Sequence, residues 1–150
     1  MTNAPDSARL PAAAPPDGLL EAALYAKDLD AAAAFYGGVM GLDEVTRVEG
    51  RHVFFRVGRA VLLVFNPEAT AKGGSNPRLP VPPHGARGPG HLCFAASRAE
   101  IEAWRSRLEA AGHAIEEEFD WPNGARSIYF RDPAGNSIEM AEPRLWFDEG

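Results

Sequence analysis

The sequence predicts an α+β fold of two tandem βαβββ modules, whose strands form a curved, cup-like mixed sheet with the helices outside. One observation is the order of elements, since strand, helix and three strands occur twice, at about 18–66 and 89–143. The other is a residue-level repeat, in which FFRVGRAVLLVFNP (54–67) aligns with YFRDPAGNSIEMAEP (129–143) when one residue is added in the turn. A duplicated unit places equivalent positions around a shared axis, where they can face one cavity.

The first module begins with the apolar segment LLEAALYA (19–26), which predicts a strand. Asp28 is a suitable N-cap for an Ala-rich helix that reaches about Gly37. Three strand-like segments follow, from residues 42, 52 and 60, and the turn signals Gly50-Arg51 and Gly58-Arg59 separate them.

The second module follows a loop at 67–88 and begins with the strand GHLCFAAS (90–97). Ser97 and Glu100 form an S-x-x-E capping box at the start of the second helix. Three more strands are predicted near 114–119, 126–131 and 137–142, and the turn sequence Asp132-Pro133-Ala134-Gly135-Asn136 joins the last two.

Composition excludes several classes of protein. The chain has 150 residues and a net charge of -6 without a basic stretch, which argues against a nucleic-acid partner. The single cysteine, Cys93, cannot form an internal disulfide, and no apolar run approaches the length of a membrane span. We therefore expect a cytoplasmic protein with one domain at 18–143, a flexible tail at 1–17 and a C-terminal tail at 144–150.

Glu21, His91 and Glu139 are the candidate metal ligands. Because side chains alternate along a strand, each strand has two faces, and each of these residues shares its face with small neighbours. A lone strand His or Glu is more often a surface or core residue, but these three occupy repeat-related strands. If Glu21 and Glu139 meet, their repulsion must be relieved either by protonation of one of them or by a cation between them. One imidazole and two carboxylates suit one divalent ion such as Mn, Fe, Ni or Zn.

Other residues are candidates for the same cavity. Tyr129 shares the face of Glu139 and could donate a hydrogen bond to a metal-bound oxygen, or it could be a plain strand aromatic. Phe54 and Phe65 could form the cavity wall, or pack in the core. Arg56 and Arg131, which are repeat-equivalent, could bind an anionic substrate group, although strand arginines are usually solvated. Two histidines are expected to lie elsewhere. His84 is in the long loop, and loops of that length are often either lids or disordered, whereas His52 is expected to be a turn or surface residue.

These segments together resemble the vicinal oxygen chelate superfamily, which contains glyoxalase I, bleomycin resistance proteins, fosfomycin resistance enzymes, methylmalonyl-CoA epimerase and extradiol dioxygenases. LYAKDLDAAAAFYGGVMGL (24–42), GHLCFAAS (90–97) and IYFRDPAGNSIEM (128–140) carry the resemblance. It implies a metal in the cup with ligands from the first and fourth strands of each module. Glu21 then stands where many members have His or Gln, and Leu63 stands where a carboxylate or amide is common.

The resemblance implies a metal-dependent enzyme that acts on a small oxygenated organic substrate by glyoxalase-type lyase or isomerase chemistry. Glu139 or Glu21 would be the catalytic base, and Tyr129 would assist. An extradiol-type dioxygenase is the enzymatic alternative, and a drug-sequestering binding protein of the bleomycin resistance type is the non-enzymatic one. We expect a homodimer, and the cup can form within one chain or across two.

Overall fold

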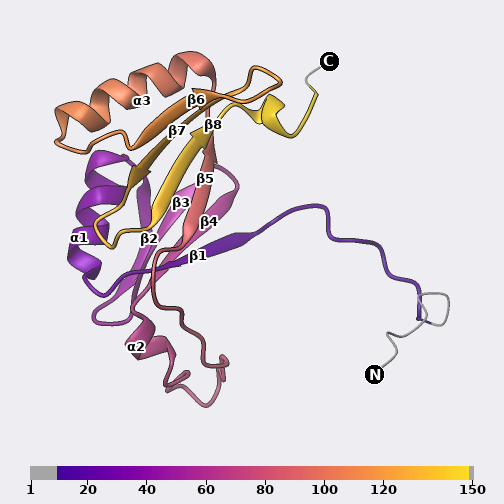
Figure 1. Cartoon of the computed structure of the whole chain (residues 1–150). Coiled ribbons are helices and arrows are strands. Elements are labelled where there is room, and N and C mark those ends of the chain that lie inside the picture. The colour runs from indigo at the N-terminus through magenta and orange to yellow at the C-terminus, as the bar shows by residue number, and fades with distance from the viewer. Residues whose placement is uncertain (1–9, 149–150) are drawn as a thin grey trace.

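A computed structural model describes residues 10–148 and contains two four-stranded sheets (Figure 1). The first sheet has the order β1-β4-β3-β2 and the second has the order β5-β8-β7-β6. In each sheet the first strand runs parallel to the last strand of its module, and the other pairs are antiparallel. This identical order confirms the predicted pair of βαβββ modules. The elements are β1 (Glu21–Tyr25), α1 (Leu29–Ala33), η2 (Ala34–Val39), β2 (Asp43–Val48), β3 (His52–Val57), β4 (Ala60–Phe65), α2 (Pro67–Thr70), β5 (His91–Ala95), α3 (Arg98–Ala110), β6 (Glu117–Asp120), β7 (Arg126–Arg131), β8 (Ser137–Ala141) and η3 (Pro143–Leu145).

The strand register agrees with the alignment of the two modules. Leu63 of β4 pairs with Phe54 of β3, and Glu139 of β8 pairs with Tyr129 of β7. The two pairs therefore occupy equivalent places in the two sheets, as the residue-level repeat predicts.

The first helix begins as predicted but continues differently. The Asp28 side chain accepts a hydrogen bond from the Ala31 N–H and caps α1. Beyond Ala33 the helix widens into a π-helical segment, in which the N–H of Met40 bonds the carbonyl of Phe35, five residues back. Gly41 then ends the segment at a φ of +72°, in the left-handed region that favours glycine.

The second helix, α3, has the predicted capping box. The Ser97 hydroxyl accepts from the Glu100 N–H at 3.2 Å, and the Glu100 carboxylate accepts from the Ser97 N–H at 3.4 Å. Ile101 and Leu108 of α3 are buried in the core. Figure 1 shows α1 and α3 on the same side of the two sheets, so that neither helix covers the opposite faces, which we call the open faces.

The two modules are joined by a buried polar contact. The Tyr36 hydroxyl donates to Asp132 Oδ2 at 2.7 Å, and Tyr36 is 0% exposed. Burial, followed by the Asp132 carboxylate, raises the pKa of Tyr36 far above its ordinary range. The Asn136 side chain extends the junction, since its Nδ2 donates to the Tyr25 carbonyl and its Oδ1 accepts from the Gly90 N–H. The predicted turn at 132–136 is thus also the junction between the modules.

The loop at 67–88 and the C-terminal segment contain more structure than the sequence predicts. The loop at 67–88 starts with α2, whose N-cap is Asn66. Residues 10–20 form no helix or strand and extend from the body (Figure 1), whereas 1–9 of the predicted N-terminal tail lie outside the described residues. In the C-terminal tail, Arg144 holds η3 to the Gly124 carbonyl at 2.5 Å, and residues 149–150 lie outside the described range. Within 10–148, no helix is both long and apolar enough to span a bilayer.

Candidate functional site

His91 and Glu139 meet on the open face of the second sheet. They lie on adjacent parallel strands, β5 and β8, and their neighbours Ile138 and Met140 point into the core. His91 Nε2 is 3.4 Å from Glu139 Oε1, and Glu139 is only 6% exposed whereas His91 is exposed. The structure therefore brings two of the three predicted metal ligands together.

A second hydrogen bond fixes the His91 ring. His91 Nδ1 is 3.0 Å from the carbonyl oxygen of Ser137. Because a carbonyl only accepts, Nδ1 carries the proton, and in neutral His91 the lone pair of Nε2 faces Glu139. Two acceptors at this distance call for a proton or a cation between them, and a histidine whose other nitrogen is bound to a carbonyl is typical of metal ligands. The donor chemistry therefore fits a divalent ion.

The carboxylate of Glu139 is the centre of a polar cluster. Ser127, which is 0% exposed, donates its hydroxyl to Glu139 Oε2 at 2.6 Å. Desolvation, and then a hydrogen bond to Glu139 and its charge, raise the pKa of Tyr129 to about 12. Desolvation and the same carboxylate also raise the pKa of Cys93 to about 12, although Cys93 lies on the open face of the sheet. The phenol and the thiol both stay protonated at neutral pH.

Sequence reasoning missed two residues of this cluster. Ser127 lies on the same face as Tyr129, two residues earlier in β7, so strand alternation could have identified it. Trp121 donates its indole N–H to Ser127 Oγ at 2.8 Å. Trp121 lies in the turn between β6 and β7, where side chains do not alternate, so strand alternation gives no such signal for it.

Glu21 lies in a separate hollow on the open face of the first sheet. The hollow has a volume of about 660 Å³. Among residues 10–148, no three His, Cys, Asp or Glu side chains come together as a metal-binding group. Within one chain, therefore, Glu21 does not join His91 and Glu139, and its role as a ligand remains a prediction. The hollow is lined by Glu21, Ala23, Val48, Arg51, His52, Phe54, Leu63, Phe65, Gly74, Ser75, Asn76, Leu79, Val81 and His84.

Aromatic rings form one wall of this hollow. His52 stacks on Phe54 with ring centroids 4.0 Å apart, and Phe54 meets the edge of Phe65 at 5.2 Å. The expectation that His52 is a turn or surface residue is wrong, because it begins β3 and its Nδ1 is buried. Burial, and then the charge of Arg51, lower the pKa of His52.

His84 attaches the long loop to the first sheet. Its Nδ1 lies 2.7 Å from the Tyr25 hydroxyl, and its ring meets Phe65 at 4.6 Å. The alternative of a disordered loop therefore does not apply at this point, and His84 covers one side of the hollow. A role of the loop as a lid remains a prediction.

The two predicted substrate arginines lie elsewhere. The Arg131 guanidinium is bound to the Glu116 carboxylate, with N–O distances of 2.6 and 3.0 Å, and also donates to the Gly135 carbonyl. Arg56 is exposed near the end of β3. Neither is among the described residues that line the hollow around Glu21. Their binding of an anionic substrate group thus remains untested.

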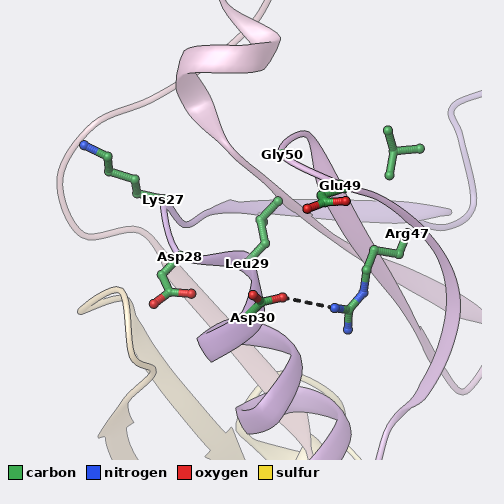
Figure 2. Close-up of a pocket in the computed structure, with 8 residues that line it drawn as sticks. Lys27, Asp28, Leu29, Asp30, Arg47, Glu49 and Gly50 are labelled. Atoms are coloured by element: carbon green, nitrogen blue, oxygen red, sulfur yellow. Dashed lines mark hydrogen bonds and ion pairs between the residues drawn. The ribbon is translucent and has the colours of Figure 1, made fainter.

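A further open hollow of about 710 Å³ lies where α1 begins (Figure 2). Its surface carries charges of both signs, and Arg47 is paired with Asp30 at 3.2 Å across it. None of the predicted site residues lines this hollow, so we place the candidate site on the open faces of the two sheets.

The paired modules and the His-carboxylate face define a protein of the vicinal oxygen chelate class. A family model of the Glyoxalase/Bleomycin resistance protein/Dioxygenase superfamily matches residues 18–140, and the chain belongs to this superfamily. No curated protein sequence matches the chain significantly.

Solved structures show which proteins this chain is similar to. A lactoylglutathione lyase from Agrobacterium tumefaciens is 48% identical, with a TM-score of 0.85, and the match covers 90% of this chain and 100% of that one. A glyoxalase/bleomycin resistance protein/dioxygenase from Nocardioides is 23% identical, with a TM-score of 0.68, and covers 92% of this chain and 89% of its own. The second likeness concerns the fold alone.

Proposed function

We propose that this protein is a metal-dependent enzyme that acts on a small organic substrate with adjacent oxygen atoms, by lyase or isomerase chemistry of the glyoxalase type. The observation that carries the proposal is the His91–Glu139 pair, two acceptors 3.4 Å apart on an open face. The 48% identity to the Agrobacterium lactoylglutathione lyase supports the same reaction class.

His91, Glu139 and Glu21 would hold one divalent ion, of Mn, Fe, Ni or Zn. We propose that Glu21 comes from a second copy of the chain in a homodimer with twofold symmetry. Two features support this arrangement: one chain leaves the His91 face of β5 exposed, and it keeps Glu21 in the hollow of the other module. A second copy could bring that hollow over the His91–Glu139 pair.

Each residue of the site has a proposed task. The bound ion would act as a Lewis acid on the adjacent oxygens of the substrate. Glu139 or Glu21 would move a proton between neighbouring carbon atoms, because a carboxylate held beside the substrate is a suitable base. The pKa of Tyr129 is raised to about 12, so its phenol keeps the proton and would donate a hydrogen bond to a substrate oxygen. Phe54 and Phe65 would contact the carbon part of the substrate.

Metal analysis of the purified protein tests the ligand set. We expect about one divalent ion per chain in the wild type and a loss of bound metal in Glu21→Gln, His91→Gln and Glu139→Gln. Glu44→Gln is a matched control, because Glu44 lies on β2 and pairs with Arg47. A wild type that neither retains nor takes up a divalent ion would refute the proposal and favour a binding protein. Oxygen uptake with a catechol would favour a dioxygenase instead.

Mixed dimers test whether the site spans two copies. Glu21→Gln and Glu139→Gln are each expected to be inactive with the hemithioacetal isomer of lactoylglutathione. This isomer is the test substrate because the isomerisation runs downhill toward the thioester. If the two variants are refolded together, a heterodimer contains one site with Glu21 from one copy and intact His91 and Glu139 from the other. We expect the mixture to regain activity, up to about a quarter of wild type for random pairing by mass action. No recovery, although heterodimers form, would place the site within one chain.

A further inference from the structure

We propose that Trp121 and Ser127 position Glu139 through a chain of two hydrogen bonds, which fixes the carboxylate oxygen that faces His91. This inference rests on the proposed function, because it assigns a task to two residues behind the proposed metal ligand. We call the three residues the Trp121–Ser127–Glu139 chain.

The direction of both hydrogen bonds follows from the chemistry of the groups. An indole N–H can only donate, so Ser127 Oγ, 2.8 Å away, is the acceptor. The hydroxyl proton of Ser127 is then directed to Glu139 Oε2, at 2.6 Å, because an ionised carboxylate only accepts. Ser127 is 0% exposed and Glu139 is 6% exposed, so water offers these groups few other partners.

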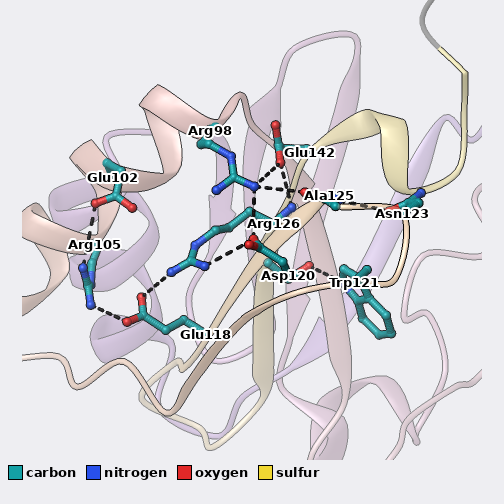
Figure 3. Close-up of polar contacts among 12 residues, drawn as sticks. Arg98, Glu102, Arg105, Glu118, Asp120, Trp121, Asn123, Ala125, Arg126 and Glu142 are labelled. Atoms are coloured by element: carbon teal, nitrogen blue, oxygen red, sulfur yellow. Dashed lines mark hydrogen bonds and ion pairs between the residues drawn. The ribbon is translucent and has the colours of Figure 1, made fainter.

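Local structure holds Trp121 in place. The backbone N–H of Trp121 donates to the Ala125 carbonyl at 2.8 Å, and the backbone carbonyl of Trp121 accepts from the Gly124 N–H at 2.7 Å. Figure 3 shows Trp121 beside this turn, together with Asn123 and Ala125. The indole also meets the ring of Phe119 edge-on, with centroids 4.9 Å apart. The donor is therefore fixed before any ligand binds.

The consequence falls on the other carboxylate oxygen. Because Oε2 is engaged by Ser127, Oε1 is directed to His91 Nε2, 3.4 Å away. A partial rotation of the carboxylate plane would break the bond to Ser127. Partners of this kind orient metal ligands, and their loss typically costs about 10- to 100-fold in metal affinity.

The first module supplies an internal comparison. At the positions equivalent to Glu139 and Ser127 it has Leu63 and His52, as the strand register shows. Neither Leu63 nor His52 could form the same chain to a carboxylate. Within residues 10–148, the Trp121–Ser127–Glu139 chain is therefore found only in the module that supplies His91 and Glu139, two of the proposed ligands.

Titration calorimetry with Ni²⁺ tests the positioning role in the full chain. We expect Ser127→Ala to weaken binding about 10- to 100-fold and Trp121→Phe to weaken it by a smaller factor. The double variant should bind like Ser127→Ala, because Trp121 acts only through the serine hydroxyl. Trp146→Phe is the control, since Trp146 is 80% exposed. Additive losses in the double variant, or a Ser127→Ala protein with wild-type affinity, would overturn the inference.

A second measurement needs no metal and separates this inference from the proposed function. In the ¹⁵N spectrum of the metal-free protein, the Trp121 indole N–H should exchange slowly with water. It should shift and exchange faster in Ser127→Ala, and it should shift in Glu139→Gln. An indole signal that neither variant moves would refute the chain even if Ni²⁺ binds. If the two variants show these shifts but the wild type binds no Ni²⁺, the proposed function is refuted and the hydrogen-bonded chain stands.

Discussion

The Tyr36–Asp132 hydrogen bond should be a measurable part of the link between the modules. Tyr36→Phe keeps the buried ring and removes only the hydroxyl, which donates to Asp132 Oδ2 at 2.7 Å. Hydrogen bonds to charged groups contribute about 1.5–3 kcal/mol. Asp132 keeps other donors, because its Oδ1 accepts from the Ala134 and Asn136 N–H groups and its Oδ2 accepts from Asn136 Nδ2. We therefore expect a loss near the lower limit, about 1.5–2 kcal/mol in the free energy of unfolding.

Urea unfolding at neutral pH and a fixed protein concentration measures this loss, because the stability of an oligomer depends on concentration. For a chain of this size the same loss lowers the melting temperature by about 3–8 °C. Tyr25→Phe is the matched control, since its hydroxyl bonds His84 at the loop instead of a buried carboxylate. We expect it to cost less than about 0.5 kcal/mol. Equal losses in the two variants, or a Tyr36→Phe protein as stable as wild type, would refute the reasoning.

Three further predictions concern acid stability, thiol reactivity and the long loop. The Arg126 N–H donates to Glu142 at 2.7 Å and lowers the pKa of that carboxyl below its ordinary value. Its contribution to stability is therefore present above the ordinary carboxyl pKa and is lost as the pH falls through the lowered pKa. Glu142→Gln should thus lower the melting temperature at pH 7. The melting temperature of this variant should also fall less steeply over the acidic range in which wild-type Glu142 becomes protonated, and an unchanged slope would contradict this. Because desolvation and Glu139 raise the pKa of Cys93 to about 12, iodoacetamide at pH 8 should alkylate it at least about tenfold more slowly than a free thiol, and Glu139→Gln should increase the rate. His84→Ala removes the partner of the Tyr25 hydroxyl and a ring contact with Phe65, so limited proteolysis should cut the loop at 67–88 faster than in wild type; equal cleavage rates would show that other contacts hold the loop.

The strand pattern predicted most of the fold, because two segments with the same sequence pattern form sheets with the same strand order and register. Because Leu63 aligns with Glu139 and Phe54 aligns with Tyr129, a pair in one module implies the equivalent pair in the other, and the structure has both pairs. The π-helical segment after Ala33 was not predictable, since nothing in the apolar spacing distinguishes a widened turn from a regular one. The junction through Asp132 was also missed, because a turn motif specifies its own hydrogen bonds and not its distant partners.

The candidate site was predictable only within each sheet. Alternation shows that His91 and Glu139 share an open face, and the structure places them 3.4 Å apart. It cannot show which other face lies opposite, because that depends on how the modules pack. Glu21 is therefore on the predicted kind of surface, yet within one chain it lies in a different hollow.

The two modules keep the same backbone plan and divide the proposed work between them. The first module replaces the buried carboxylate with Leu63 and surrounds it with His52, Phe54 and Phe65, which makes its open face suited to carbon-rich groups. The second module keeps Glu139 and anchors it through Ser127, which makes its open face suited to a cation. An ion on the second module can act on a substrate bound by the first module only if the two open faces meet. The exposed His91 face of β5 shows that the described part of one chain does not cover the open face of the second module. Since mass action then links assembly to metal binding, an ion held by both copies would stabilise the dimer by the free energy of its own binding.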